Sequence, residues 1–379
     1  MKHYKMMDVV SEISERENSP STSGYDRFVG LEHYVSGEVE ITNYGTTANL
    51  DSAMKVFHSG DILVARRNVY LKRASVVSFD GLTSGDSIVL RAKDDRIVRL
   101  LPFVLNTDAF WDYADQYSDG TMSKRLSPKT LMKYEFDLPD EDQQDHLADT
   151  LWAAAETKVS YQHLLTQTDE LVKSQFIEMF GDPVANEKGW PLTTISDVAE
   201  IKIGPFGTLL HKNDYIEGGH ALVNPSHITD GRICIDPKLT VSDAKYDELS
   251  SYKLQVGDVV LGRRGEMGRC AVVYEEGLLC GTGSMILRPS KKMRSYFLQN
   301  IISSPTYRSI IEGKAVGVTM MNLNVPIVSS LIIPQLPVNL QDQFIKFMEQ
   351  TDKAKFELKQ AIESVSSLIK SLMQQDFSN

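Results

Sequence analysis

Two long stretches of the chain carry hydrophobic residues at the spacing of a helix. In the stretch at about residues 339–377, these positions alternate in steps of four and three: Leu358, Ile362, Val365, Ile369 and Leu372. Such heptad spacing is typical of a helix that pairs with another helix. The stretch at about residues 140–181 has a similar but less regular pattern. At ~1.5 Å per residue, about 38 helical residues extend roughly 57 Å, which exceeds the diameter of a small domain. We therefore expect the two helices to pair with each other.

The two stretches are also near copies of each other. Each begins after Leu-Pro, and their tails read LVKS at residues 171–174 and LIKS at residues 368–371, 197 positions apart. The same offset relates GDILVARR at residues 60–67 to GDVVLGRR at residues 257–264. A repeat of this size indicates two copies of a globular domain, each followed by a long helix.

The regions ahead of the helices alternate short apolar runs with turn residues. The apolar run at residues 62–65 follows a Gly-Asp turn and predicts a strand, as does the run at residues 74–79. A helix is predicted over residues 102–117, with Phe103, Phe110 and Tyr113 toward the core. Mixed strands with few helices predict α+β domains. The predicted segments are a first domain at 1–138, a first helix at 139–182, a second domain at 183–337 and a second helix at 338–379.

Composition and charge narrow the class of protein. The chain has 379 residues, 42% of them hydrophobic, and a net charge of −11. No apolar run approaches the roughly 20 residues that span a bilayer, and the start lacks the core of a signal peptide, so we expect a cytoplasmic protein. Its three cysteines form no CxxC pair, which favours reduced thiols. Much of the acid falls in the first helix, so the net charge is a weak guide to DNA binding elsewhere.

Motifs for catalysis are incomplete in this sequence. Asn224-Pro225-Ser226-His227 has the first two residues of the tetrapeptide with which amino-methyltransferases grip a flipped base, but lacks the second proline and the aromatic. The glycines at residues 277–283 have the wrong spacing for a nucleotide loop, and the histidines form no HExxH or Cys/His cluster. We therefore expect no catalytic residue, no bound cofactor and no metal site in this chain.

The duplicated plan, the Leu-Pro before a glutamine-rich helix start, the LVKS or LIKS tail and the Gly-Asp strand before an arginine pair together resemble the specificity subunit of type I restriction-modification systems. The resemblance covers essentially the whole chain. It implies two target recognition domains, each reading one half of a bipartite asymmetric DNA sequence. It also implies an antiparallel coiled coil of the two long helices, with internal pseudo-two-fold symmetry, and no catalysis by this subunit.

The resemblance also implies partners. These are double-stranded DNA, two methyltransferase subunits that bring S-adenosylmethionine, and restriction or translocase subunits that bring ATP with magnesium. The acidic start of the first helix, from Asp140 to Asp149, is a hypothetical docking site for the methyltransferase subunits. The alternative is a coiled-coil assembly adaptor that never touches DNA. A specificity subunit predicts binding to duplex DNA that falls steeply with salt, whereas an assembly adaptor predicts no such binding.

Arginine suits guanine in the major groove because its fork matches two acceptors, while lysine and serine mostly contact phosphates. On this basis the DNA-binding candidates of the first domain are Arg66, Arg67, Arg73, Ser123, Lys124 and Arg125. Those of the second domain are Lys212, Arg263, Arg264, Arg269, Thr319 and Asn322.

Overall fold

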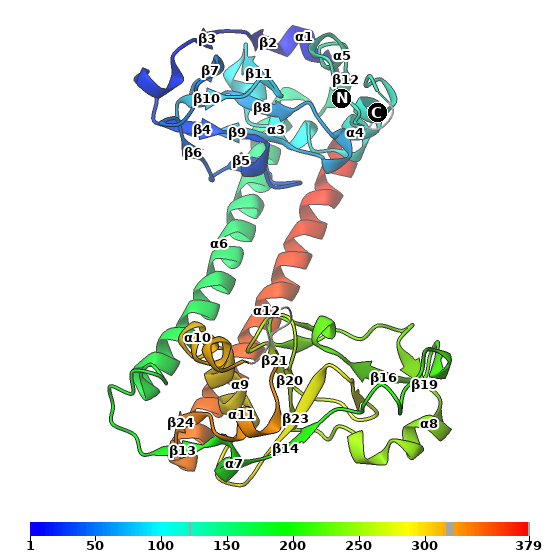
Figure 1. The fold of residues 1–379 in the computed structure, drawn as a ribbon. Helices are drawn as coiled ribbons and strands as arrows, with labels where there is room; N and C mark the ends of the chain where they lie inside the picture. The colour runs from blue at the N-terminus through cyan, green and yellow to red at the C-terminus, as the bar shows by residue number, and fades with distance from the viewer. Residues whose placement is uncertain (121–122, 316–321, 378–379) are drawn as a thin grey trace. The chain divides into compact units, whose positions relative to one another are not determined.

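The computed structural model describes residues 1–120, 123–315 and 322–377 (Figure 1). The chain divides into two compact units, the first formed by Met1–Thr166 and Phe356–Asn379 and the second by Gln167–Lys355. Two long helices, α6 (Glu141–Phe180) and α12 (Val338–Asp376), each contribute one part to either unit. Among the described residues, no helix combines the length and apolar character needed to cross a membrane.

The first unit is built on two five-stranded sheets. One has the order β2 (Val10–Ile13), β11 (Ser87–Ala92), β8 (Ile62–Ala65), β9 (Ala74–Val77) and β5 (Glu40–Ile41). The other has the order β3 (Arg16–Glu17), β7 (Met54–Phe57), β10 (Gly81–Thr83), β4 (Arg27–Val29) and β6 (Gly45–Thr46). A separate antiparallel pair joins β1 (Lys2–Lys5) to β12 (Glu135–Leu138). The shorter helices are α1 (Met6–Val9), α2 (Asp95–Val98), α3 (Leu101–Val104), α4 (Asp108–Gln116) and α5 (Pro128–Leu131). Short 3₁₀ turns are η1 (Pro20–Thr22), η2 (Leu31–His33) and η3 (Val69–Leu71).

The helix predicted over residues 102–117 is two helices, so that prediction is wrong in its extent. The break falls at Thr107, whose side chain accepts a hydrogen bond of 3.1 Å from the backbone of Phe110. This is an N-cap, which satisfies a backbone donor that a new helix start leaves free. Phe103 and Phe110 are fully buried, as predicted. A capping residue followed by Asp108 in the first turn was the sequence signal for this break.

Parts of both long helices pack on the core of the first unit. Leu147 and Leu151 come from the start of α6, and Met373 and Phe377 from the end of α12 and the residue just after it; all four join one buried cluster. The five predicted heptad positions of α12 lie in this unit and are half-buried. Pairing the start of one helix with the end of the other is the antiparallel arrangement.

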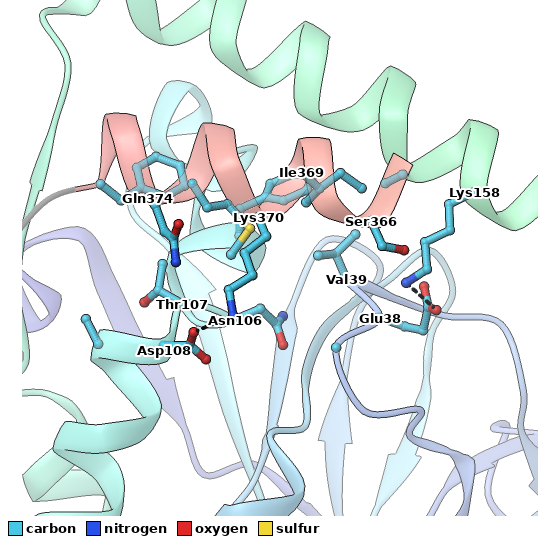
Figure 2. A pocket seen from close by; sticks show the side chains of 16 residues that line it. Glu38, Val39, Asn106, Thr107, Asp108, Lys158, Ser366, Ile369, Lys370 and Gln374 are labelled. Atoms are coloured by element: carbon cyan, nitrogen blue, oxygen red, sulfur yellow. Dashed lines mark ion pairs between the residues drawn. The ribbon is translucent and has the colours of Figure 1, made fainter. Parts of the chain in front are cut away.

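A cavity of about 480 Å³ lies beside the end of α12 in the first unit (Figure 2). Two ion pairs line it: Lys370 with Asp108 at 2.9 Å and Lys158 with Glu38 at 2.8 Å. The first pair ties α12 to the start of α4. Hydrogen bonds from Lys72 and Lys370 lower the pKa of Asp108 to about 2.

The second unit repeats the architecture with a longer insertion. Its central sheet has the order β14 (Ala199–Ile203), β23 (Ser284–Pro289), β20 (Val259–Gly262) and β21 (Cys270–Val272). A second sheet has the order β15 (Tyr215–Ile216), β19 (Thr240–Val241), β16 (His220–Val223) and β22 (Leu279–Cys280). Two pairs complete the strands: β13 (Leu192–Thr194) with β24 (Ile332–Pro334), and β17 (Ile228–Thr229) with β18 (Arg232–Ile233).

Besides the two long helices, the second unit has shorter helices, and the aromatic rings of one of them, α9 (Ser295–Ser303), cluster with rings of α6 and α12. The helices are α7 (Ile195–Val198), α8 (Asp243–Glu248), α9 (Ser295–Ser303), α10 (Pro305–Lys314) and α11 (Val325–Ser329), with 3₁₀ turns η4 (Lys212–Asp214), η5 (Pro225–His227) and η6 (Ser250–Tyr252). Phe180 at the end of α6 packs on Phe297 with centroids 4.6 Å apart and on Phe344 of α12 at 5.6 Å. Here the end of α6 meets the start of α12. The predicted α+β fold with two long, paired helices is therefore confirmed.

The repeat has a physical basis in a buried carboxylate ahead of each central strand. Asp61 and Asp258 are each 1% exposed. Arg91 donates two hydrogen bonds of 2.7 Å to Asp61, and Arg288 donates two of 2.8 Å to Asp258. The glycine before each carboxylate has a φ of +91° or +93°, a conformation that favours glycine. The Gly-Asp motif is thus a turn that buries one half of an ion pair.

The glutamine-rich helix starts are explained in the same way. Gln144 donates a hydrogen bond of 2.8 Å to the carbonyl of Pro139, and Gln341 donates one of 2.9 Å to the carbonyl of Leu336. Both glutamines are buried, at 3% and 0% exposure. A buried carbonyl without a donor is costly, so these side chains stabilise the entry into each long helix.

Candidate nucleic-acid interface

The first group of candidates gathers where β8 ends. Strand β8 is buried along its whole length, and the arginine pair follows it directly. The amide of Arg66 donates to the carbonyl of Asp86 at 2.9 Å, and the carbonyl of Arg66 accepts from Leu126 at 2.8 Å. Arg67 forms an isolated antiparallel bridge with Arg125. Three segments that are distant in sequence therefore meet at this end of the sheet.

A single carboxylate lies among these arginines. Arg125 donates a hydrogen bond of 2.7 Å to Oδ1 of Asp86, and Nη1 of Arg67 lies 3.6 Å from Oδ2. Arg66 donates through Nε to the carbonyl of Leu126 at 3.2 Å. Burial lowers the pKa of Arg66, and the neighbouring charge of Arg125 lowers it further. Three guanidinium groups with one carboxylate leave a positive group, whose outer members Arg67 and Arg125 are exposed.

The remaining candidates of the first unit are held by other contacts. Arg73 donates to the carbonyls of Leu31 at 2.9 Å and Arg67 at 3.1 Å, and burial lowers its pKa. Lys124 donates to the side chain of Asp115 at 2.5 Å and to its backbone carbonyl at 2.9 Å. Arg73 and Lys124 thus brace the loops that carry the exposed arginines.

Ser123 lies beside the arginine group and stays exposed. Its hydroxyl donates a hydrogen bond of 3.0 Å to Asn68, which has a φ of +55°. Asn68 follows the arginine pair directly, and its amide donates to the carbonyl of Lys124 at 3.0 Å. Ser123 therefore lies in a loop that is hydrogen-bonded to the loop of Arg67.

The second unit builds the matching group at the end of β20. The amide of Arg263 donates to the carbonyl of Gly283 at 3.0 Å, and Arg264 bridges Asn322. Arg263 is only 8% exposed, and its Nε donates to Oδ1 of Asn322 at 3.2 Å. Burial lowers the pKa of Arg263, with a further contribution from Arg264. Arg264 is the exposed member and the one available to a ligand.

Among the described residues, the other second-unit candidates form no side-chain contact with this group, although the carbonyl of Arg269 accepts a hydrogen bond of 2.8 Å from the amide of Gly262, the residue before the arginine pair. Arg269 donates to the carbonyl of Pro225 at 3.2 Å and pairs with Glu266. Hydrogen bonding from Arg269 lowers the pKa of that carboxyl. Lys212 is exposed on η4 and forms no ion pair or hydrogen bond with any described residue. Thr319 lies outside the described residues.

Sequence reasoning missed Asp86 in the first arginine group and, elsewhere on the first unit, the basic residue Arg27. Asp86 was overlooked because a lone aspartate in a Gly-Asp turn has no motif of its own. The signal was a difference between the repeats, since the matched position is Gly283. Arg27 was also missed; its guanidinium lies 4.9 Å from the ring centre of the exposed Tyr44, a cation–π contact of a basic and an aromatic group at the surface.

The described residues contain no group of three or more histidine, cysteine or acidic side chains that could hold a metal ion. Cys270 and Cys280 are buried, and burial raises the pKa of both thiols, that of Cys270 to about 12. Both are therefore protonated at neutral pH and poor nucleophiles. Cys234 is exposed.

Comparison with known proteins relates part of this chain to a described family. Residues 187–365 match the family described as the type I restriction modification DNA specificity domain. This part of the chain is therefore similar to the specificity domain that the family describes. The matched range covers the second globular domain and much of the second long helix, and the 197-residue repeat relates the first half of the chain to it.

An individual relative and solved structures agree with this match. A putative type I restriction enzyme specificity subunit of Methanocaldococcus jannaschii is 26% identical over 196 residues. The match covers 50% of this chain and 45% of that relative, so it spans less than half of the relative's length. A chain from a structural study of assembly and conformational transition of the type I R-M system has a TM-score of 0.60 at 17% identity, covering 99% of this chain and 96% of that one.

A second solved structure, the type I restriction-modification S subunit of M. genitalium, has a TM-score of 0.57 at 14% identity. The alignment covers 100% of this chain and 96% of that subunit. At these identities the two structures show that this chain shares their fold.

Proposed function

We propose that this chain recognises a bipartite, asymmetric sequence in double-stranded DNA and directs partner subunits to it. The observation that carries the proposal is the duplicated arginine group at the end of each central strand. Arg67 and Arg264 occupy matched positions, are both exposed, and each follows a buried strand of a specificity fold. Two such groups with different neighbours would read two different half-sites.

The chemistry of these groups suits DNA. Arginine binds phosphate and reads guanine through two parallel hydrogen bonds, and asparagine reads adenine through its amide. Each group offers an exposed guanidinium on a backbone that is fixed by hydrogen bonds to neighbouring segments. Rigid support of this kind lowers the entropy lost on binding. The overall charge of −11 does not oppose this, because the positive groups are local.

The chain would act without catalysis of its own. Methylation and cleavage would belong to partner subunits, two methyltransferase subunits with S-adenosylmethionine and restriction subunits with ATP and magnesium. The acidic start of α6 remains a candidate for docking the methyltransferase subunits. In this segment Asp140 pairs with the N-terminus at 3.1 Å and Asp149 with Arg99 at 2.6 Å. Asp142 and Asp145 are exposed and have no ion pair with a described residue, so they are the carboxylates to reverse.

Two experiments test the proposal. The first selects duplexes from a random library with the full chain, and then measures affinity against salt. We expect a two-part motif with a fixed gap and a steep fall of affinity with salt. Arg67→Ala should relax one half of the motif and Arg264→Ala the other, so each variant is the control for its counterpart. Absence of any selected sequence would favour an assembly adaptor.

The second experiment co-expresses the chain with the neighbouring methyltransferase subunit and maps methylated adenines in genomic DNA. We expect methylation within the motif that the library selects. The double variant Asp142→Lys, Asp145→Lys should weaken assembly with the methyltransferase subunit without changing the motif. Unchanged assembly would move the docking site elsewhere on the chain.

A further inference from the structure

The two arginine groups differ at one matched position. Asp86 in the first unit and Gly283 in the second lie 197 residues apart. Both carbonyls accept a hydrogen bond from the first arginine of the pair, at 2.9 Å and 3.0 Å. The backbones therefore correspond, while a carboxylate is present in one unit and no side chain in the other.

A second difference accompanies the first. The residue opposite the exposed arginine is Arg125 in the first unit and Asn322 in the second, again 197 residues apart. Where the carboxylate is present its partner is arginine, and where it is absent the partner is asparagine. Three arginines with one aspartate carry the same net charge as two arginines with neutral partners. The attraction to phosphates is thus matched, and the orientation of the side chains is what differs.

The geometry around Asp86 favours orientation of the two guanidinium groups. Its carboxylate accepts a hydrogen bond of 2.7 Å from Arg125, and Oδ2 lies 3.6 Å from Nη1 of Arg67. The side chain of Asp86 is 25% exposed, whereas those of Arg67 and Arg125 are 52% and 45% exposed. The carboxylate is therefore the more covered partner, behind arginines that reach the surface. A charge-assisted hydrogen bond restricts the rotation of a guanidinium and leaves its other donors free.

We propose that Asp86 is a positioning residue that orients Arg125 and Arg67 for reading a guanine in the half-site of the first unit. This inference rests on the proposed function. In the second unit Asn322, held by Nε of Arg263, takes the place of the aspartate-bound arginine. Since asparagine prefers adenine, the two units would differ in the base that they read at this matched position.

The test uses the full-length chain and selection from a random duplex library. Arg125→Ala first identifies the base pair concerned, as the position whose preference it relaxes. Asp86→Asn should relax the preference for guanine at that same position by roughly 10- to 100-fold, the range of one good bidentate contact. The other half-site should keep its preference. Asp51→Asn, an exposed carboxylate of the same unit, makes the same change of charge and should leave both half-sites unchanged.

A double variant transfers the residues of the second unit to the first. Asp86→Gly with Arg125→Asn should replace the guanine preference at the identified position with a preference for adenine. If Asp86→Asn unfolds at a lower temperature than the wild type in circular dichroism, the double variant tests the inference in its place. We expect it to fold, because the second unit folds with these residues at the matched positions.

Two results would overturn the inference. One is an Asp86→Asn chain that keeps its guanine preference and binds all duplexes more tightly, which would make Asp86 a simple repulsive charge. The other is an equal loss of preference in both half-sites. A wild-type chain that selects no sequence would overturn the proposed function and this inference with it. A wild type with a clear motif that the Asp86 variants retain would overturn the inference alone.

Discussion

The buried carboxylates Asp61 and Asp258 provide the sharpest test of the repeated architecture. Asp61→Asn preserves the volume of the side chain but removes the charge that Arg91 binds. It also sets an amide donor against the guanidinium in place of one acceptor oxygen. Asp258→Asn makes the same change against Arg288 in the second unit. We expect each substitution to destabilise mainly its own unit.

The magnitude follows from the contacts. Asp61 accepts two hydrogen bonds from Arg91 and a third, of 2.8 Å, from the amide of His58. Disrupting a buried ion pair by removing one partner costs about 3–5 kcal/mol. The side chain of Arg91 is 41% exposed and can regain water, which favours the lower end of that range, about 3 kcal/mol. Arg288 is 35% exposed, so Asp258→Asn should cost a similar amount.

Urea unfolding followed by tryptophan fluorescence can separate the units. Trp111 and Trp152 belong to the first unit and Trp190 to the second, and the chain has three tryptophans. With an m-value of about 2–3 kcal/mol/M, a loss of about 3 kcal/mol lowers the midpoint by roughly 1 M or more. For the first unit, Asp61→Asn is measured in a Trp190→Phe chain, in which Trp111 and Trp152 report, and it should show this shift. For the second unit, Asp258→Asn is measured in a chain that keeps Trp190 as its sole tryptophan, and it should show the same shift.

The controls separate the ion pair from general damage. Asp51→Asn alters an exposed carboxylate and should leave the midpoint unchanged. In a double-mutant cycle, Asp61→Asn with Arg91→Gln should cost less than the sum of the single changes, because the pair acts as a unit. A loss below about 1 kcal/mol for both aspartates would refute the reasoning, since that is the level of an exposed pair.

Three further outcomes follow from the structure. Gln144→Ala and Gln341→Ala should each lower stability by about 1–3 kcal/mol in thermal unfolding, because each leaves a buried carbonyl without its donor; an effect within error would show that water takes over the role. Asp108 has a lowered pKa in the fold, so its stabilisation is present above pH 4 or so and is lost as the pH falls toward about 2. Asp108→Asn should flatten the pH dependence of unfolding in that window only, by no more than about 1 kcal/mol since the carboxylate is half exposed. Arg264→Ala should weaken DNA binding by about 1–3 kcal/mol without lowering the stability of the fold. Arg263→Ala should also destabilise the fold, because Arg263 is buried and bound to Asn322. An equal loss of affinity for all duplexes would show that the arginine contacts a phosphate and not a base.

The long helices and the duplication were predictable because both are properties of pattern. A heptad stripe and an unbroken run of helix-forming residues are read along the chain, and a shared offset is read by comparing the chain with itself. The break at Thr107 was missed because the apolar spacing runs through it, while the cap that ends one helix and starts the next depends on a single side chain.

The sequence indicated the arginine pairs after the Gly-Asp strands as candidates. It did not indicate which arginine of each pair is buried and which is exposed. Arg263 and Arg264 are neighbours in sequence, yet one is buried against Asn322 and the other is exposed. Successive residues at the end of a strand face opposite sides, so burial is decided by what packs on each side. Lys124, a plain basic residue in the sequence, is held by Asp115 from the end of α4.

The sequence by itself determined the class of the fold, the two helices, the repeat and the region of each candidate surface, since these depend on local spacing and on internal similarity. Only the tertiary structure decided which basic groups remain free to bind. Asp86 meets an arginine 39 positions away, and Arg263 meets an asparagine 59 positions away. Hydrogen bonds and ion pairs depend on distances of a few ångströms, which the chain sets only when its sheets have assembled.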